Sequence, residues 1–466
     1  MKINLSFKVT LLAVVSATCL PGCNQSSAQV GLPAVLVVAA QPAESGPQTK
    51  QPKATSSNGE VQPIEGDTVE TQFDTSTLPV PAEIPDFVHR GISWLVEAQH
   101  KNGGWGGGSH ANQSQLDPHS IKTDPATTAF AAMALLRTGH TTSSGDYQQT
   151  VLRAAEYLLD AVESASEEGP KITEITGTQP QAKLGPLVDT SMTAQFLARL
   201  LPTLQKKSKL HKRTDVALDK CLTKLQASQK ADGSWNVGGG WAPVLQSSLS
   251  STALELAQVG GKKIAPQSLK RAREYQNRNI NSDTGVAVAG GLGGAAGVEL
   301  YAFSSAQRAN AADASSAERT VRKAKAAGRL PQNASVSKEN LQLLGVGEDK
   351  AVRWAKSVKQ KNAQLARLDD DRLLAGFGNN GGEEFLSYLM TSESLVICGG
   401  NDWTKWNNKM HTRLNKIQNS DGSWNGHHCI SSPVFCTAAV VQCLTSDRDV
   451  KTLAKVAHQA ELASVD

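Results

Sequence analysis

The chain has 466 residues, a length that allows two or three domains or one large repeat domain. Hydrophobic residues make up 39% of the sequence, which is ample for a packed core. The formal net charge of +4 is small for this length and argues against a nucleic-acid partner, because such a partner requires a concentrated basic surface.

The first 22 residues have the pattern of a secretory signal peptide. Two lysines precede an apolar run at 9–20, which is too short to span a membrane stably. The Leu-Pro-Gly-Cys that follows resembles a bacterial lipobox, and this resemblance implies cleavage before Cys23 and lipidation of that cysteine. Cleavage nearby, for instance after Ala28, is the alternative. We therefore expect an exported protein that the lipidated Cys23 anchors to a membrane of the bacterial cell envelope.

Residues 23–84 are rich in Pro, Ser, Thr, Gln and Gly and contain almost no aromatic side chain. Such a segment cannot bury enough apolar surface to offset the entropy lost on ordering, so we predict a disordered tether. The folded domain is then expected to cover residues 85–466.

A Gln-x3-Gly-x-Trp pattern occurs three times in the predicted domain. Each copy follows an amphipathic stretch, and its glycine suits a helix-ending turn because glycine adopts positive φ without steric cost. The glutamine amide can bond backbone groups of a neighbouring unit, and the tryptophan can pack on the adjacent helix pair. We interpret the pattern as repeat architecture rather than catalysis. The copies are Gln99, Gly103 and Trp105; Gln229, Gly233 and Trp235; and Gln418, Gly422 and Trp424.

Two kinds of helix alternate along the domain. One kind is charged and amphipathic, as expected of helices with one solvated face, and the other is small and apolar, as expected of buried helices. Six such pairs predict an all-α fold, an α/α toroid (six-hairpin α/α barrel) of six outer and six inner helices. The outer helices are predicted at 87–100, 147–164, 215–228, 266–277, 317–327 and 403–418, and the inner ones at 127–138, 190–201, 248–259, 291–304, 385–398 and 434–444.

One region interrupts this alternation. The stretch from about residue 306 to residue 362 is rich in Ala, Lys and Arg and poor in large apolar side chains. We predict that they form a helical insertion covering one side of the ring.

The tryptophan turns, with Arg-Gly-x2-Trp-Leu before the first, resemble the QW repeats of the terpenoid cyclase and protein prenyltransferase superfamily, which includes squalene–hopene cyclases. Asp-x3-Thr-Ala at Asp124 and at Asp189 adds to the resemblance, which spans residues 85–444. The resemblance implies the toroid and a hydrophobic, isoprenoid-like ligand. Proton-initiated cyclases of this superfamily use Asp-x-Asp-Asp, but the acidic run at 369–371 lacks a fourth aspartate and is interpreted as a surface segment. That mechanism is therefore disfavoured, and whether the chain is an enzyme stays open.

Three candidate catalytic carboxylates lie near the starts of inner helices, where the helix dipole favours acidic groups. A glycine-rich loop at 378–382 leads into Glu383 and Glu384, and glycines at this density permit close approach by a ligand. Asp189 is the third candidate. A helix cap is the competing interpretation for Asp189 and for Asp124.

His427, His428, Cys429 and Cys436 form a dense group of metal-ligand residue types around the start of the last inner helix. Zinc is one interpretation, with His428 also a catalytic candidate, because protein prenyltransferases hold a zinc ion with Asp, Cys and His from late inner helices. Two alternatives are a Cys429–Cys436 disulfide, which an exported protein permits, and histidines that only hydrogen-bond the turn.

Three functions fit these observations. The first is an isoprenoid-related cyclase or transferase with a hydrophobic substrate inside the ring. The second is a non-enzymatic toroid that binds a ligand or a protein at its mouth. The third is an extracytoplasmic, metal-dependent lyase or hydrolase that uses Glu383, Glu384 and the 427–429 cluster. An aromatic-lined cavity would favour the first, a filled ring the second and an acidic cleft the third.

Overall fold

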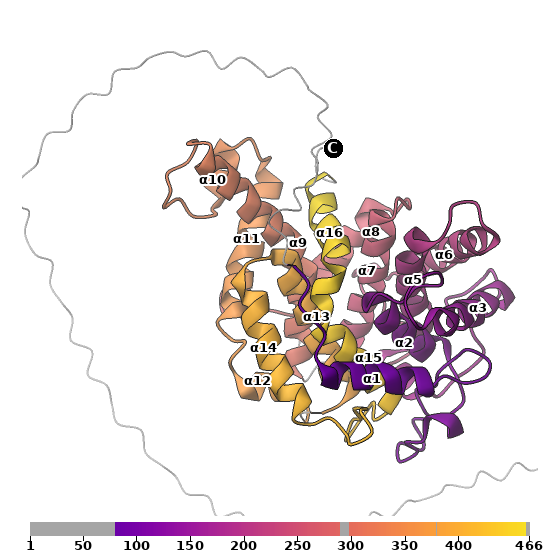
Figure 1. Ribbon diagram of the computed structural model, residues 1–466. Helices are drawn as coiled ribbons and strands as arrows, with labels where there is room; N and C mark the ends of the chain where they lie inside the picture. The colour runs from indigo at the N-terminus through magenta and orange to yellow at the C-terminus, as the bar shows by residue number, and fades with distance from the viewer. Residues whose placement is uncertain (1–79, 289–297, 379, 463–466) are drawn as a thin grey trace, which may run out of the picture. The chain divides into compact units, whose positions relative to one another are not determined.

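The structure, a computed structural model, describes residues 80–288, 298–378 and 380–462 (Figure 1). The predicted signal peptide, Cys23 and the predicted tether up to residue 79 lie outside these ranges. Within them the regular elements are helices, joined by loops that carry three isolated β-bridges. None of the described helices is both long and apolar enough to cross a membrane.

Six helices form a closed inner ring. Each packs against the next along the chain, and the last packs against the first. Most of their residues are buried, as expected of helices that other helices surround. The ring consists of α2 (Pro125–Arg137), α5 (Val188–Leu200), α7 (Pro243–Val259), α9 (Glu299–Ala326), α13 (Gly382–Cys398) and α15 (Pro433–Leu444).

Six amphipathic helices lie outside the ring, and each buries one face against it. Helix α3 packs on α2, α6 on α5, α8 on α7 and α9, α11 on α9, α14 on α13 and α15, and α1 on α15. This arrangement confirms the predicted all-α toroid of six helix pairs. The outer helices are α1 (Asp86–Glu97), α3 (Gln148–Ser164), α6 (Lys209–Ser228), α8 (Pro266–Asn277), α11 (Glu348–Leu365) and α14 (Asn401–Asn415).

The three tryptophan turns make the same contacts, as their packing role requires. In each, the glutamine amide donates to the carbonyl of its own glycine and to a carbonyl of a neighbouring outer helix, and the buried indole donates to the preceding helix. Gly103 has a φ of +86°, and a Cβ there would lie 2.4 Å from the carbonyl oxygen of Arg153. In the last copy Gln418 donates to the carbonyl of Phe87 in α1, so this turn joins the end of the ring to its beginning.

The region predicted as an insertion is in part a component of the ring. Helix α9 is the fourth inner helix; it begins at Glu299 and continues unbroken to Ala326. The stretch at 317–327, which was expected to be a separate outer helix, is therefore the extension of α9. No glycine or proline interrupts this alanine-rich stretch, which explains its continuity. The extension packs with α10 (Lys338–Leu343) and α11 around a second, small apolar cluster that includes Trp354 (Figure 1). Residues 291–297 of the expected inner helix lie outside the described ranges.

The C-terminal helix was not expected from the sequence. Helix α16 (Val450–Leu462) follows a short 3-10 helix, η3 (Ser446–Asp449), and packs against the inner helices α7, α9 and α13. It therefore fills the ring at the end where the inner helices finish. The remaining short elements are η1 (Pro118–Ser120), α4 (Gln179–Leu184), η2 (Leu201–Thr203) and α12 (Asp371–Ala375).

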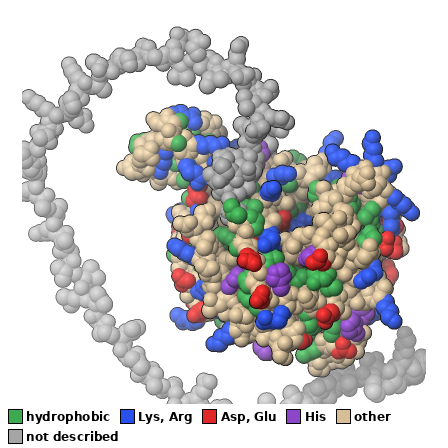
Figure 2. Space-filling view, in the orientation of Figure 1, with side chains coloured by type: hydrophobic (Ala, Val, Ile, Leu, Met, Phe, Trp, Pro, Cys, Tyr) green, Lys and Arg blue, Asp and Glu red, His purple; other side chains and the backbone are tan. Residues whose placement is uncertain are grey.

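The acidic run at 369–371 lies on the surface, as predicted. Asp370 caps α12 by accepting from the backbone N–H of Arg372 and Leu373, and Asp369 is 97% exposed. On the face shown in Figure 2, acidic and basic side chains are interspersed over the outer helices.

Candidate functional site

The N-terminal ends of three inner helices bring five reactive side chains together at one mouth of the ring. Tyr301 comes from the first turn of α9, Glu383 and Glu384 from the first turn of α13, and His428 and Cys429 from the turn before α15. We call these five residues the mouth cluster. They converge because the inner helices all begin at the same end of the ring and pack in the order α9, α13, α15.

Glu384 is completely buried, and its two carboxylate oxygens have different surroundings. Oε1 accepts hydrogen bonds from the Tyr301 hydroxyl and from the backbone N–H of Phe377, both at 2.9 Å. Among the described residues Oε2 has no hydrogen-bond partner, and it lies 3.7 Å from Nε2 of His428. Both ring nitrogens of His428 are likewise buried with no partner in the described part of the chain. The pair thus has unused hydrogen-bonding capacity in a buried place.

Glu383 is also buried, and one of its oxygens meets a protein donor. Its Oε2 accepts from the backbone N–H of Ile430 at 3.2 Å. Burial, followed by the charge of Glu384, raises the pKa of Glu383 to about 7. Burial and Glu383 in turn raise the pKa of Cys429 to about 11, so this thiol keeps its proton. Cys429 has a φ of +58°, which a non-glycine residue rarely adopts.

The glycines before α13 are needed because the loop backbone lies directly on the mouth cluster. A Cβ at Gly381 would lie 2.6 Å from Oε2 of Glu384 and 2.7 Å from Cε1 of His428, and one at Gly378 would lie 2.8 Å from the same imidazole. The close approach predicted from these glycines therefore involves the Glu384–His428 pair. Asn379 of this loop lies outside the described ranges.

The four predicted zinc ligands do not fit a metal. Within residues 80–288, 298–378 and 380–462, no three His, Cys, Asp or Glu side chains are grouped so that they could hold an ion. His427 is exposed, and Cys436 is buried in the first turn of α15 with its thiol directed to the carbonyl of Ile430. Cys429 and Cys436 are both free thiols, so the alternative disulfide is absent as well. Proximity in sequence misled here because Cys436 is turned to the backbone of Ile430 and His427 is exposed.

Asp189 belongs to a different part of the mouth. Its Oδ1 accepts from the backbone N–H of Ala126 at 3.0 Å and its Oδ2 from the amide of Gln181 at 2.7 Å, so its hydrogen bonds join α5 to α2 and α4. Asp124 caps α2 by accepting from the backbone N–H of Thr127, which confirms the capping interpretation for that residue. Burial raises the pKa of both aspartates. With both oxygens satisfied by protein donors, Asp189 serves packing rather than the mouth cluster.

Two contributors to the mouth escaped the sequence interpretation. The Gln179 amide oxygen accepts from the backbone N–H of Ser431 at 2.7 Å, so α4 reaches across the mouth to the last inner helix. Tyr301 belongs to no motif in the sequence, and its position in the first turn of a small-residue helix is the available signal.

Two exposed aromatic rings lie just before inner helices, and one of them contacts the mouth cluster. Trp241, just before α7, is 68% exposed, and the ammonium group of Lys183 lies 4.5 Å from the centre of its ring. Phe377, before α13, is 67% exposed and meets the ring of His428 edge-on at 5.4 Å. The charge of Lys183 opposes, without outweighing, the burial that raises the pKa values of Glu383 and Cys429.

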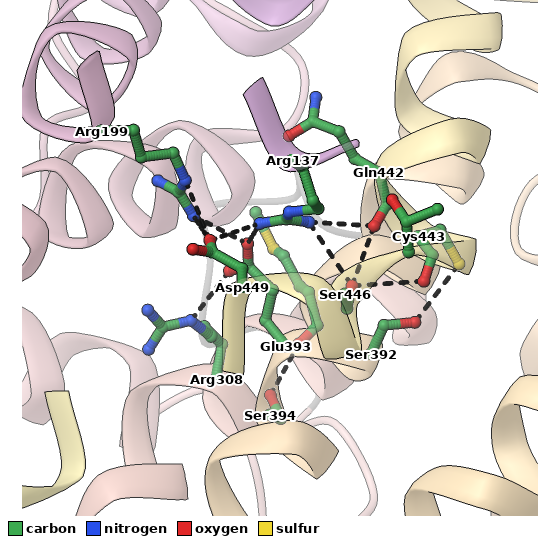
Figure 3. Close-up of polar contacts among 12 residues, drawn as sticks. Arg137, Arg199, Arg308, Ser392, Glu393, Ser394, Gln442, Cys443, Ser446 and Asp449 are labelled. Carbon is green, nitrogen blue, oxygen red and sulfur yellow. Dashed lines mark hydrogen bonds and ion pairs between the residues drawn. The ribbon is translucent and has the colours of Figure 1, made fainter. Parts of the chain in front are cut away.

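The opposite end of the ring holds a buried ionic network (Figure 3). Glu393 of α13 lies between guanidinium groups of Arg137, Arg199 and Arg308, from three other inner helices, and Asp449 pairs with the first two of these. Burial would raise the pKa of Glu393, but the three guanidinium groups outweigh it and lower the pKa to about 2. Charged groups therefore occupy the part of the ring beside α16.

No family model matches the sequence, and a search among curated proteins found no match. Among solved structures, an inactive variant of an α-1,6-mannanase from Salegentibacter sp., in complex with α-1,6-mannotriose, is 8% identical with a TM-score of 0.47 over 78% of this chain and 99% of that one. The type II terpene cyclase MstE from Scytonema is 13% identical with a TM-score of 0.38 over 78% of this chain and 98% of that one. The fold assignment rests on the helix arrangement described above.

Proposed function

We propose that the protein is an acid–base enzyme that cleaves a carbohydrate at the mouth of the ring, with Glu383 as proton donor and Glu384 as proton acceptor. The observation that carries this proposal is the convergence of two carboxyl groups, a phenol, a thiol and an imidazole from the starts of three helices. Breaking a glycosidic bond requires a proton for the leaving oxygen and a second carboxylate that activates water or attacks the sugar.

The two glutamates suit these different roles. Glu383 has a pKa of about 7, so it retains a proton to donate near neutral pH. Glu384 is held by Tyr301 and Phe377 through one oxygen, which leaves the other free to accept a proton beside His428. The glycine-rich loop covers this pair, so a substrate must displace it to reach the carboxylates.

The surroundings of the mouth favour a sugar over a hydrocarbon. The exposed rings of Trp241 and Phe377 offer flat apolar faces beside hydrogen-bonding groups, the combination that the two sides of a sugar ring require. An isoprenoid chain held inside the ring would instead meet Glu393 and its three guanidinium groups. Separating these buried charges from one another would cost free energy. This argues against the cyclase or transferase interpretation.

Activity should be sought on a panel of polysaccharides with two readouts, released reducing ends for hydrolysis and ultraviolet absorbance of an unsaturated product for elimination. Glu383→Gln and Glu384→Gln should each lower kcat by about 10²–10⁴-fold. The wild-type rate should fall as the pH rises through about 7, because Glu383 then loses the proton that it donates.

His427→Ala is the matched control, since His427 is exposed and adjacent to the mouth cluster. It should leave the rate unchanged, and so should a chelator. Oligosaccharide binding without turnover, weakened by Trp241→Ala, would instead support a non-enzymatic binding toroid. Activity that survives both glutamine substitutions would refute the assigned roles.

Export and anchoring through a lipidated Cys23 complete the proposal and rest on the resemblance of residues 20–23 to a lipobox. Such an anchor would hold the catalytic domain on a tether at a membrane surface, where extracellular glycans are accessible. Metabolic labelling with a fatty-acid analogue should mark the wild type and not Cys23→Ser. Equal labelling of both would overturn this part of the proposal.

A further inference from the structure

Lys183 of α4 is a largely buried cation without a partner for its charge. The residue is 6% exposed, whereas lysine is rarely buried in proteins unless it is paired. Its ammonium group forms no hydrogen bond or ion pair with any residue in the described part of the chain. The group lies 4.5 Å from the centre of the Trp241 ring, and an aromatic face does not replace acceptors for three N–H donors.

This ammonium group can be reached from solvent. Its Nζ atom keeps accessible surface, unlike the enclosed polar atoms of the ring interior. The neighbouring ring of Trp241 is 68% exposed. A ligand that packs against the indole beside the ammonium group can therefore accept hydrogen bonds from Lys183.

The backbone holds Lys183 and Trp241 together as one unit. The carbonyl of Lys183 accepts from the backbone N–H of Trp241 at 2.8 Å and from that of Ala242 at 2.9 Å. Gly185, directly after α4, has a φ of +101°, and a Cβ there would collide with the side chain of Gln246 in α7. Since α4 packs this tightly on α7, the cation and the ring keep their relative position without a ligand.

Helix α4 also places this unit beside the mouth cluster. Gln179 precedes Lys183 by four residues, which puts both on one face of the helix. Its amide oxygen accepts from the backbone N–H of Ser431 at 2.7 Å and of Ser432 at 3.0 Å, just before α15. The charge of Lys183 acts on the pKa of Glu383, so the free cation lies near the proposed proton donor.

We propose that the substrate is an acidic glycan, with a carboxylate or sulfate group that binds the ammonium group of Lys183 while the sugar ring packs against Trp241. The inference rests on the proposed function, because it narrows the substrate of the same site from carbohydrates to anionic ones. An anion supplies charge-assisted hydrogen bonds to Lys183. A neutral sugar leaves the buried charge unpaired, and such a mismatch is a strong source of specificity.

Isothermal titration of the full-length Glu384→Gln variant, which lacks the proposed proton acceptor, compares acidic oligosaccharides with neutral counterparts. Oligomers of galacturonate, mannuronate and glucuronate are each paired with their own methyl ester, and a sulfated galactan oligomer is paired with its desulfated form. In the pair that the site accepts, the acidic member should bind about tenfold more tightly or better. That pair also tells carboxylate from sulfate.

Two results are kept apart by measuring binding rather than turnover. Absence of any acidic preference in all four pairs would overturn the inference, even if a neutral glycan is cleaved. Selective binding of an acidic oligomer that the wild type does not cleave would refute the catalytic roles and leave the ligand class standing.

Substitutions assign the preference to Lys183. Lys183→Met removes the charge at similar length, so the acidic and neutral members should bind alike. Trp241→Ala should weaken both members by a similar factor, because it removes the surface on which the sugar ring packs. Lys171→Met is the matched control, since Lys171 is an exposed lysine that lines a separate pocket with Gln181 and Ala182 of α4. It should keep the preference.

Circular dichroism establishes whether Lys183→Met is folded, and Lys183→Gln takes its place if it is not. An unchanged acidic preference in a folded variant without the Lys183 charge would refute the assigned contact. Equal loss of the preference in Lys171→Met would indicate long-range attraction only and would refute the site.

Discussion

Glu383 and Glu393 are the same residue type, buried about three turns apart on α13, yet their pKa values move in opposite directions. Glu383 faces Glu384, so burial and a like charge together raise its pKa to about 7. Glu393 faces three guanidinium groups, which outweigh burial and lower its pKa to about 2. Partners rather than depth therefore decide whether a buried glutamate is charged. On α13, Glu383 can exchange a proton near neutral pH, whereas Glu393 keeps its negative charge.

The largest effect is expected from breaking the Glu393 network. Glu393→Gln should lower the free energy of unfolding by about 3–5 kcal/mol at pH 7, because Arg137, Arg199 and Arg308 lose their common partner. Urea denaturation measures this. Glu348→Gln, which removes an exposed partner of Lys338, should leave the free energy unchanged. A loss of less than about 1 kcal/mol, the value of an exposed pair, would contradict the comparison.

The second prediction concerns the acid side of the stability profile. Because the pKa of Glu393 is lowered from 4.5 to about 2, its contribution is present above pH 4.5 and is lost as the pH falls toward 2. The wild type should therefore lose about 2–3 kcal/mol more than Glu393→Gln over this window. Parallel denaturation series at several pH values provide the test, and identical slopes would rule out the lowered pKa.

The mouth should show the opposite dependence. Because the pKa of Glu383 is raised from 4.5 to about 7, the folded protein holds a proton that the unfolded chain releases, and stability falls as the pH rises through this window. Glu383→Gln, which mimics the protonated form, should be more stable than the wild type by about 1–3 kcal/mol at pH 8 and not at pH 4. A variant less stable than the wild type at pH 8 would show that Glu383 is charged and well paired.

A smaller effect is expected from crowding the loop over the mouth. Gly381→Ala places a Cβ 2.6 Å from Glu384 and 2.7 Å from His428, so the loop must shift at a cost of about 1–2 kcal/mol. Gly347→Ala is the control, because no atom lies within 4 Å of the Cβ and its φ is negative. Thermal denaturation should separate the two variants, and equal midpoints would mean that the loop does not rest on this pair.

The smallest expected effect comes from Lys183. Its charge lowers the pKa of Glu383, so Lys183→Met should shift the titration of Glu383 to higher pH than in the wild type. Carboxyl carbon chemical shifts followed by NMR report this titration. Lys101→Met, a change at an exposed lysine, should leave it unchanged. A downward shift in Lys183→Met would mean that burial of Glu383 depends on this side chain.

Local patterns predicted the helices that build the ring. Charged and small-residue stretches alternate with helical periodicity, so inner helices such as α2 and α5 begin and end within a few residues of their expected bounds. The tryptophan turns were interpretable for the same reason, since glutamine, glycine and tryptophan act within one turn and its neighbour. Helix α16 was missed because it lies beyond the last repeat and has no partner in the alternating pattern.

The sites were predictable only where neighbours in sequence are also neighbours in space. Glu383, Glu384 and His428 lie together, as expected, because the starts of consecutive inner helices meet at one mouth. The zinc interpretation failed because no three His, Cys, Asp or Glu side chains of the described residues are grouped so that they could hold an ion. Cys436 is turned to the backbone of Ile430, and His427 is exposed. Direction of side chains, and not their spacing, decides coordination.

Periodicity, turn residues and helix starts are local properties of the chain, so they predict the toroid and the place of its candidate mouth, although the fifth outer helix is α11 and not the stretch expected at 317–327. Which charges meet depends on packing between distant helices. Arg137, Arg199, Arg308 and Glu393 come from four helices and share no motif, and the ring brings them into one buried network. The charge state of a buried group depends on these distant partners. The pKa shifts at the two ends of the ring therefore could not be predicted from the sequence.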